Sequence, residues 1–104
     1  MALHKIADAT QIVEGDLLCV KVGDQRLCLG RTDAGRLFAV DDICSHDEFE
    51  LSDGHLDGVE VECPAHGSRF NVFTGDVSGL PATEPIKVFP LTVEGDDVYV
   101  DVDL

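Results

Sequence analysis

The chain has 104 residues and a formal net charge of −14, with 21 acidic against 7 basic side chains. This length supports one domain, residues 1–104, with a single modest hydrophobic core. So strong a negative charge argues against nucleic acid and anionic membrane as partners, and it favours encounters with basic protein surfaces.

Neither a membrane span nor a leader is expected from the sequence. No run approaches the roughly eighteen apolar residues that a transmembrane helix requires. Residues 1–6, Met-Ala-Leu-His-Lys-Ile, lack the basic region and the apolar run of a signal peptide. We therefore expect a soluble, cytoplasmic protein.

Short segments with strand character alternate with Gly and Asp turns along the chain, and no segment indicates a helix. The clearest strand pattern is Val-Tyr-Val-Asp-Val at 98–102, after a Glu-Gly-Asp turn. Short strands at regular spacing predict an all-β fold, a small antiparallel sandwich or barrel. The predicted strands are 3–8, 16–22, 25–32, 36–42, 59–63, 69–73, 86–93 and 97–102.

Two of the four cysteines, Cys19 and Cys28, lie in apolar strand patterns. If Gly23 and Asp24 form a two-residue hairpin turn, the pairing places Cys19 directly opposite Cys28. A disulfide is then geometrically conceivable. In a cytoplasmic protein we expect two buried free thiols instead.

The other two cysteines belong to short ligand-like pairs, Cys44-Ser45-His46 and Cys63-Pro64-Ala65-His66. Each pair follows a predicted strand and joins a thiolate to an imidazole. One interpretation is a structural Cys₂His₂ zinc site, which would make the protein a zinc-stapled interaction module. However, zinc fingers usually place both Cys in one pair and both His in the other, whereas each pair here is mixed.

The mixed pattern, C-x-H followed by C-x-x-H, resembles the Rieske family, in which two Cys and two His hold the two irons of a [2Fe–2S] cluster. The resemblance spans about residues 5–102 and implies Cys44 and Cys63 on the inner iron and His46 and His66 on the outer one. It also implies an inserted cluster-binding β subdomain at about 43–73. Neutral imidazoles in place of two thiolates raise the reduction potential, to about −150 to +300 mV.

The resemblance implies roles for four further residues around the cluster. Gly67 and Ser68 would turn the backbone so that amide N–H groups face the cluster sulfurs, and Ser68 matches a Ser that bonds a bridging sulfide. Pro81 belongs to Gly79-Leu80-Pro81, which is similar to the proline-containing loop that covers the cluster. Phe70 stands where respiratory members carry a Tyr that donates to a ligand sulfur.

Phe49 and Ala65 stand where respiratory members carry two further Cys that clamp the cluster loops by a disulfide. The chain instead resembles the Rieske-type ferredoxins of multicomponent aromatic-ring-hydroxylating dioxygenases. This implies a one-electron carrier, not an enzyme, that accepts an electron from an NAD(P)H-dependent flavoprotein reductase and passes it to a terminal oxygenase. An alternative is a small Rieske subunit like that of assimilatory nitrite reductase, bound permanently to a larger enzyme.

Partners are expected to dock transiently near His46 and His66 on a monomeric carrier. An acidic set around the first pair is predicted to steer them toward the cluster. His55, between the pairs, is interpreted as an exposed turn residue within the hairpin turns at 52–58. The acidic set consists of Asp41, Asp42, Asp47, Glu48, Glu50 and Asp53.

Overall fold

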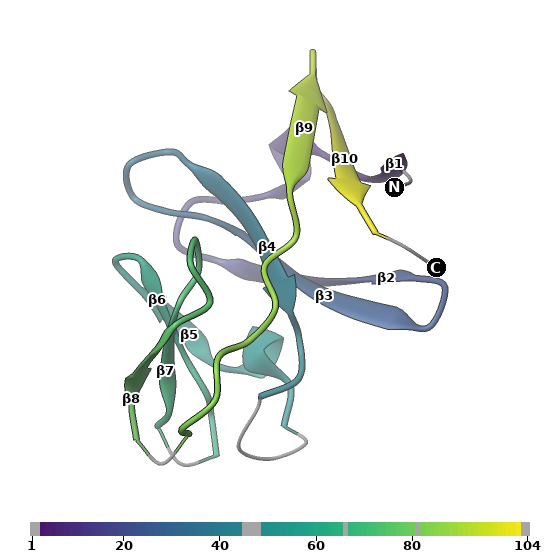
Figure 1. Ribbon diagram of the computed structural model, residues 1–104. Helices are drawn as coiled ribbons and strands as arrows, with labels where there is room; N and C mark the ends of the chain where they lie inside the picture. The colour runs from purple at the N-terminus through teal and green to yellow at the C-terminus, as the bar shows by residue number, and fades with distance from the viewer. Residues whose placement is uncertain (1–2, 45–48, 66, 81, 103–104) are drawn as a thin grey trace.

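The computed structural model describes residues 3–44, 49–65, 67–80 and 82–102. These residues form short strands with two single-turn 3₁₀ segments, η1 (Ala9–Gln11) and η2 (Leu51–Asp53) (Figure 1). In chain order the strands are β1 (Leu3–Asp8), β2 (Leu17–Val22), β3 (Gln25–Arg31), β4 (Leu37–Asp41), β5 (His55–Asp57), β6 (Glu60–Glu62), β7 (Arg69–Asn71), β8 (Val77–Gly79), β9 (Leu91–Glu94) and β10 (Asp97–Asp101).

The described strands form three antiparallel sheets. One has the order β1-β10-β9 and joins the two ends of the chain, a second has the order β2-β3-β4, and a third has the order β5-β6-β7-β8. In Figure 1 the β2-β3-β4 sheet runs across the middle of the molecule, between the other two. The prediction of an all-β antiparallel fold is confirmed.

The middle sheet carries a separate apolar core on each of its faces. Leu27, Leu29 and Ala39 pack with Val98 and Val100 of β10 in one core. The alternate residues Cys28, Phe38 and Val40 pack with Val61, Phe70 and Val72 in the other. Successive side chains of a strand point to opposite faces. Because both faces of β3 are covered, its residues 27–30 are all buried.

The hairpin of β2 and β3 has the predicted register. Val22 pairs with Gln25 across the Gly23-Asp24 turn, and Cys19 therefore lies opposite Cys28. Side chains at directly opposite positions share a face of the sheet. The turn residues alone were thus sufficient to set this pairing.

One strand prediction is wrong, and two short strands were not predicted. β9 begins at Leu91, not at residue 86, because Pro90 has no N–H to donate to a ladder. Residues 86–89 lie beside β4 and are joined to it by individual backbone hydrogen bonds, including Asp41 N to Lys87 O and Phe89 N to Ala39 O. β5 and β8 were not predicted, since each is only three residues long and contains turn-forming residues.

The segment after the third sheet is fixed against a turn of that sheet. Gly75 has a φ of +79° and its carbonyl accepts from Ile86 N at 2.9 Å. A Cβ at this position would lie 2.1 Å from Ile86 O, so only glycine allows this approach.

Within the described part of the chain, no helix has the length and apolarity to cross a membrane.

Candidate metal centre

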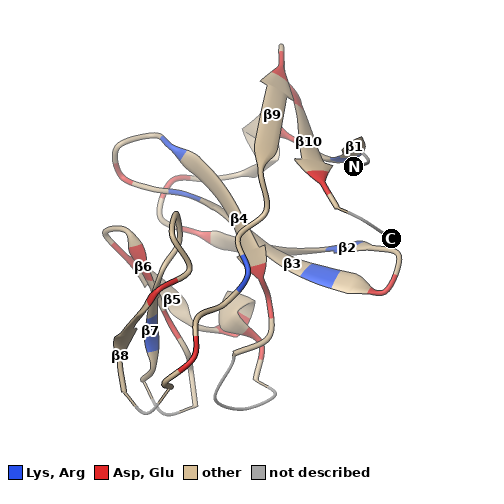
Figure 2. Cartoon of the chain, in the orientation of Figure 1, with Lys and Arg blue, Asp and Glu red and all other residues tan. Residues whose placement is uncertain are grey.

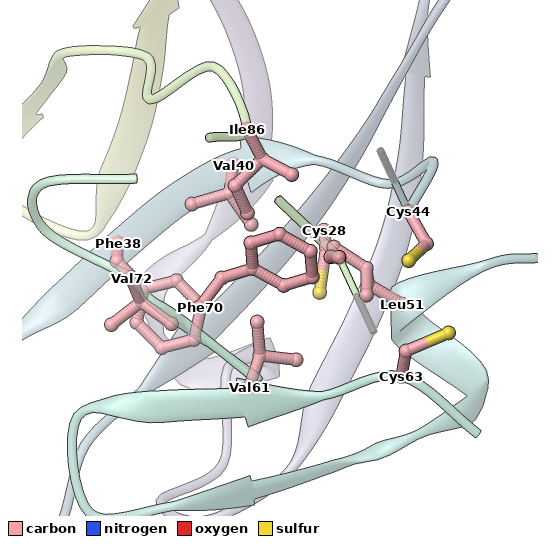
Figure 3. Close-up of a cluster of buried hydrophobic side chains, with 11 residues drawn as sticks. Cys28, Phe38, Val40, Cys44, Leu51, Val61, Cys63, Phe70, Val72 and Ile86 are labelled. Carbon is pink, nitrogen blue, oxygen red and sulfur yellow. The ribbon is translucent and has the colours of Figure 1, made fainter. Parts of the chain in front are cut away.

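Cys44 and Cys63 converge from two separate loops. Cys44 follows β4 and Cys63 follows β6, yet both belong to one apolar cluster and each is only 3% exposed. Figure 3 shows their sulfur atoms at the same end of this cluster, beside Leu51. The structure therefore brings together two buried thiols that lie far apart in the sequence.

Each of these cysteines begins a loop that backbone hydrogen bonds close. Cys44 N donates to Phe49 O at 3.0 Å, and Ile43 and Glu50 form an antiparallel bridge at the loop's base. Cys63 N donates to Ser68 O at 2.8 Å. The candidate ligands His46 and His66 lie outside the described residues, one within each closed loop.

Gly67 and Ser68 complete the second loop in different ways. Gly67 has a φ of +77°, and its N–H donates to Cys63 O at 3.2 Å. This amide closes the turn, so we do not count it as a donor to the cluster. Ser68 is fully buried, and its hydroxyl oxygen accepts from Ala82 N at 3.0 Å. Pro81, immediately before Ala82, lies outside the described residues.

Phe70 fills the centre of the same apolar cluster. It is fully buried on β7, where it pairs with Val61 and Val77 on the neighbouring strands. Figure 3 shows its ring reaching into the cluster between Val40 and Val61. A phenyl ring contributes packing at this position and no hydrogen-bond donor.

The acidic set does not form a uniform exposed rim. Asp42 is fully buried, and Glu50 is paired with Arg26, so neither is available for steering in the way that we predicted. The Asp41 carboxylate accepts from Ile43 N at 3.0 Å, whereas Asp53 is exposed. Asp47 and Glu48 lie outside the described residues.

His55 is exposed but is not a turn residue. It belongs to β5, and its Nε2 lies 2.7 Å from the carboxylate of Glu62, directly opposite on β6. On the same sheet, Arg69 contacts Asp57 at 2.5 Å. The turn interpretation failed because the pairing partners lie further along the chain.

Cys19 and Cys28 are free thiols. Cys28 is buried as expected, but Cys19 is exposed, which contradicts our expectation for that residue. Burial raises the pKa of the Cys28 thiol far above its ordinary value. Partial burial and a hydrogen bond to Asp42 raise the pKa of Cys19 as well. Both thiols are therefore held in the protonated, weakly nucleophilic form.

The residues present fit an iron–sulfur group. Two thiols buried in apolar surroundings suit an inner iron shielded from water, since thiolates are the soft ligands that iron–sulfur clusters use. The Ser68 oxygen accepts from Ala82, which leaves the hydroxyl hydrogen available to a nearby acceptor such as a cluster sulfur. Each closed loop contains one histidine to complete a mixed ligand set.

Comparison with known protein families identifies the family of this chain. The family described as the Rieske [2Fe-2S] domain matches its residues 2–90. The chain belongs to the Rieske family. Its cofactor is accordingly a Rieske-type [2Fe–2S] cluster.

Two curated relatives are named as ferredoxin components of dioxygenase systems. The chain is 45% identical over 92 residues to the ferredoxin component of the p-cumate 2,3-dioxygenase system of Pseudomonas putida, covering 88% of this chain and 78% of the relative. It is 38% identical over 103 residues to the ferredoxin component of biphenyl 2,3-dioxygenase of Rhodococcus jostii (strain RHA1), covering 99% and 95%.

A solved Rieske structure has the same fold over nearly its full length. It comes from the complex of reduced oxygenase and oxidized ferredoxin in carbazole 1,9a-dioxygenase, with a TM-score of 0.88 and 37% identity. The match covers 94% of this chain and 100% of that one.

Proposed function

We propose that this Rieske protein is the electron-carrying ferredoxin of a multicomponent aromatic-ring dioxygenase system. It carries one electron at a time from a flavoprotein reductase to a terminal oxygenase. The observation that carries this proposal is the convergence of Cys44 and Cys63 as buried thiols from two closed loops. The names of the curated relatives support the assignment to an oxygenase system.

The four ligands proposed from the sequence are Cys44 and Cys63 for one iron and His46 and His66 for the other. The cluster, when bound, supplies reversible one-electron chemistry. The chain's residues keep the thiols buried and close the two loops, and the Ser68 hydroxyl would donate toward a cluster sulfur. We count Phe70 as an apolar wall of this site.

Two exposed apolar side chains belong to segments that form or contact the two ligand loops. Leu80 is 78% exposed and precedes the segment that Ser68 ties to the second ligand loop. Phe49 is 46% exposed at the end of the first ligand loop. Large apolar groups exposed beside a functional site often mark a partner interface. We propose that both partners dock here, over His46 and His66.

Charge favours basic partners. Figure 2 shows Asp and Glu on all three sheets, whereas Lys and Arg occupy few positions. A net charge of −14 accelerates encounters with positively charged surfaces and gives the association a strong salt dependence. Monomeric state and a cytoplasmic location stay predictions.

The proposal is tested by electron transfer between purified components. The protein is reduced stoichiometrically without oxygen and mixed with an oxidised terminal oxygenase from a p-cumate or biphenyl dioxygenase system, and its reoxidation is followed by absorbance. We expect reoxidation at a rate that rises with oxygenase concentration. A colourless, zinc-containing protein would contradict the proposal. Stable co-purification with a large reductase would favour the nitrite-reductase-type subunit instead.

A further inference from the structure

Asp42 is a fully buried carboxylate at the base of the first ligand loop, two residues before Cys44. Removing an ionised carboxylate from water is costly unless hydrogen bonds and opposite charge compensate for the lost solvent. The hydrogen bonds that compensate for the lost solvent also fix the local geometry around such a group. Its partners therefore indicate what Asp42 does.

The Asp42 side chain is bound from both sides of the loop. One carboxylate oxygen accepts from Ser52 N at 2.8 Å. The other accepts from the Ser52 hydroxyl at 3.1 Å and from the Cys19 thiol at 3.3 Å. The Arg26 guanidinium lies 3.8 Å from this second oxygen and contacts Glu50 more closely.

The Asp42 backbone adds two bonds in the same place. Its carbonyl accepts from Leu51 N at 2.6 Å, and its N–H donates to Arg26 O at 3.2 Å. Asp42 thus connects the entry of the loop to its exit at Leu51 and Ser52, and both to β3 of the middle sheet. The Ile43–Glu50 bridge is the next contact toward Cys44.

We propose that Asp42 is a positioning residue for the cluster, because its carboxylate holds both ends of the loop that carries Cys44 and His46. This inference rests on the proposed function, which places those two residues on the cluster. Ser52 is its principal partner, and Cys19 and Arg26 orient the second oxygen. A loop released at this base would no longer keep Cys44 buried beside Leu51.

Three variants of the cluster-loaded protein test the proposal: Asp42→Ala, Asp42→Asn and Ser52→Ala. The measurements are the rate of cluster loss to an iron chelator, the EPR spectrum of the reduced protein, and hydrogen exchange of the Leu51 and Ser52 amides. Asp42→Ala should accelerate cluster loss by about ten-fold or more, the factor for losing a charge-assisted hydrogen bond. Asp42→Asn keeps one acceptor for Ser52 N–H, so its effect should be smaller.

Two control variants separate positioning from charge and from general stability. Asp53→Asn removes the same charge from an exposed position in η2. Thr32→Val removes a buried hydroxyl that accepts from Arg36 N at 3.3 Å, at the opposite end of β4. We expect both controls to retain the cluster and to give the wild-type EPR spectrum.

Faster cluster loss and faster amide exchange at positions 51 and 52 in Asp42→Asn and Ser52→Ala, with unchanged controls, would support the proposal. The proposal is overturned if Thr32→Val accelerates cluster loss equally at matched thermal stability, or if Ser52→Ala has no effect on any of the three measurements. If Asp42→Ala does not fold, Ser52→Ala decides the question. A wild-type protein without iron would overturn the proposed function instead.

Discussion

The hydroxyl oxygen of Ser68 accepts a hydrogen bond from the amide of Ala82 at 3.0 Å, and both residues are buried. This single contact joins the second ligand loop to the segment that follows Leu80. Because the hydroxyl oxygen accepts from Ala82, the hydroxyl hydrogen can point away from Ala82 and donate to a cluster sulfur.

Replacing Ser68 by Ala should therefore lower the midpoint potential of the cluster. A hydrogen bond to a sulfur stabilises the extra negative charge of the reduced state more than the oxidised state. We expect a decrease of about 60 mV, which corresponds to about 1.4 kcal/mol for one electron. Protein-film voltammetry measures it. An unchanged potential would show that the Ser68 hydroxyl does not face the cluster.

Phe70 leads to a prediction about the midpoint potential of the wild-type protein. The phenyl ring is buried in the apolar core that also contains Cys44 and Cys63, and it provides no hydrogen-bond donor. We expect a wild-type potential at the low end of the Rieske range, nearer about −150 mV than +300 mV. Phe70→Tyr should raise the midpoint potential if the new hydroxyl reaches a ligand sulfur. A redox titration with a wild-type value above about +150 mV would contradict this reasoning.

Leu80 should affect partner binding without affecting the potential. Its side chain is 78% exposed, and burying a leucine at an interface contributes about 1.5–3 kcal/mol. Leu80→Ser should weaken binding to the terminal oxygenase by about ten-fold, measured from the concentration dependence of electron transfer. The matched control is Leu3→Ser, a 57% exposed leucine on the distant β1. Equal effects of the two substitutions would remove Leu80 from the proposed interface.

The two cysteines of the middle sheet should remain unreactive at neutral pH. Burial raises the pKa of Cys28, and partial burial with the Asp42 contact raises that of Cys19, so the thiolate fraction of each is reduced. Iodoacetamide labelling should therefore be slow. The labelling rate of Cys19 should rise only at pH values above those at which an ordinary thiol ionises. Mass spectrometry after denaturation serves as the positive control. Rapid labelling of Cys28 in the folded protein at about pH 8 would contradict the burial argument.

Local patterns were sufficient for some features and not for others. The Gly23-Asp24 turn predicted the pairing of Cys19 with Cys28, because a two-residue turn determines the register of its hairpin. Asp42 was misread as a surface charge, since an isolated aspartate is normally exposed. Its burial depends on Arg26 and Ser52, which adjoin it only in the folded chain. β5 and β8 likewise arise from sheet pairing between short segments that resemble turns.

The central claim is that Cys44, His46, Cys63 and His66 hold one Rieske cluster. It is tested most directly by the EPR spectrum of the reduced protein in His46→Ala, compared with His55→Ala. His55 is a suitable control because it is exposed and paired with Glu62 on the third sheet. We predict that His46→Ala abolishes the native Rieske signal and that His55→Ala leaves it intact. An unchanged signal in His46→Ala would contradict the ligand assignment.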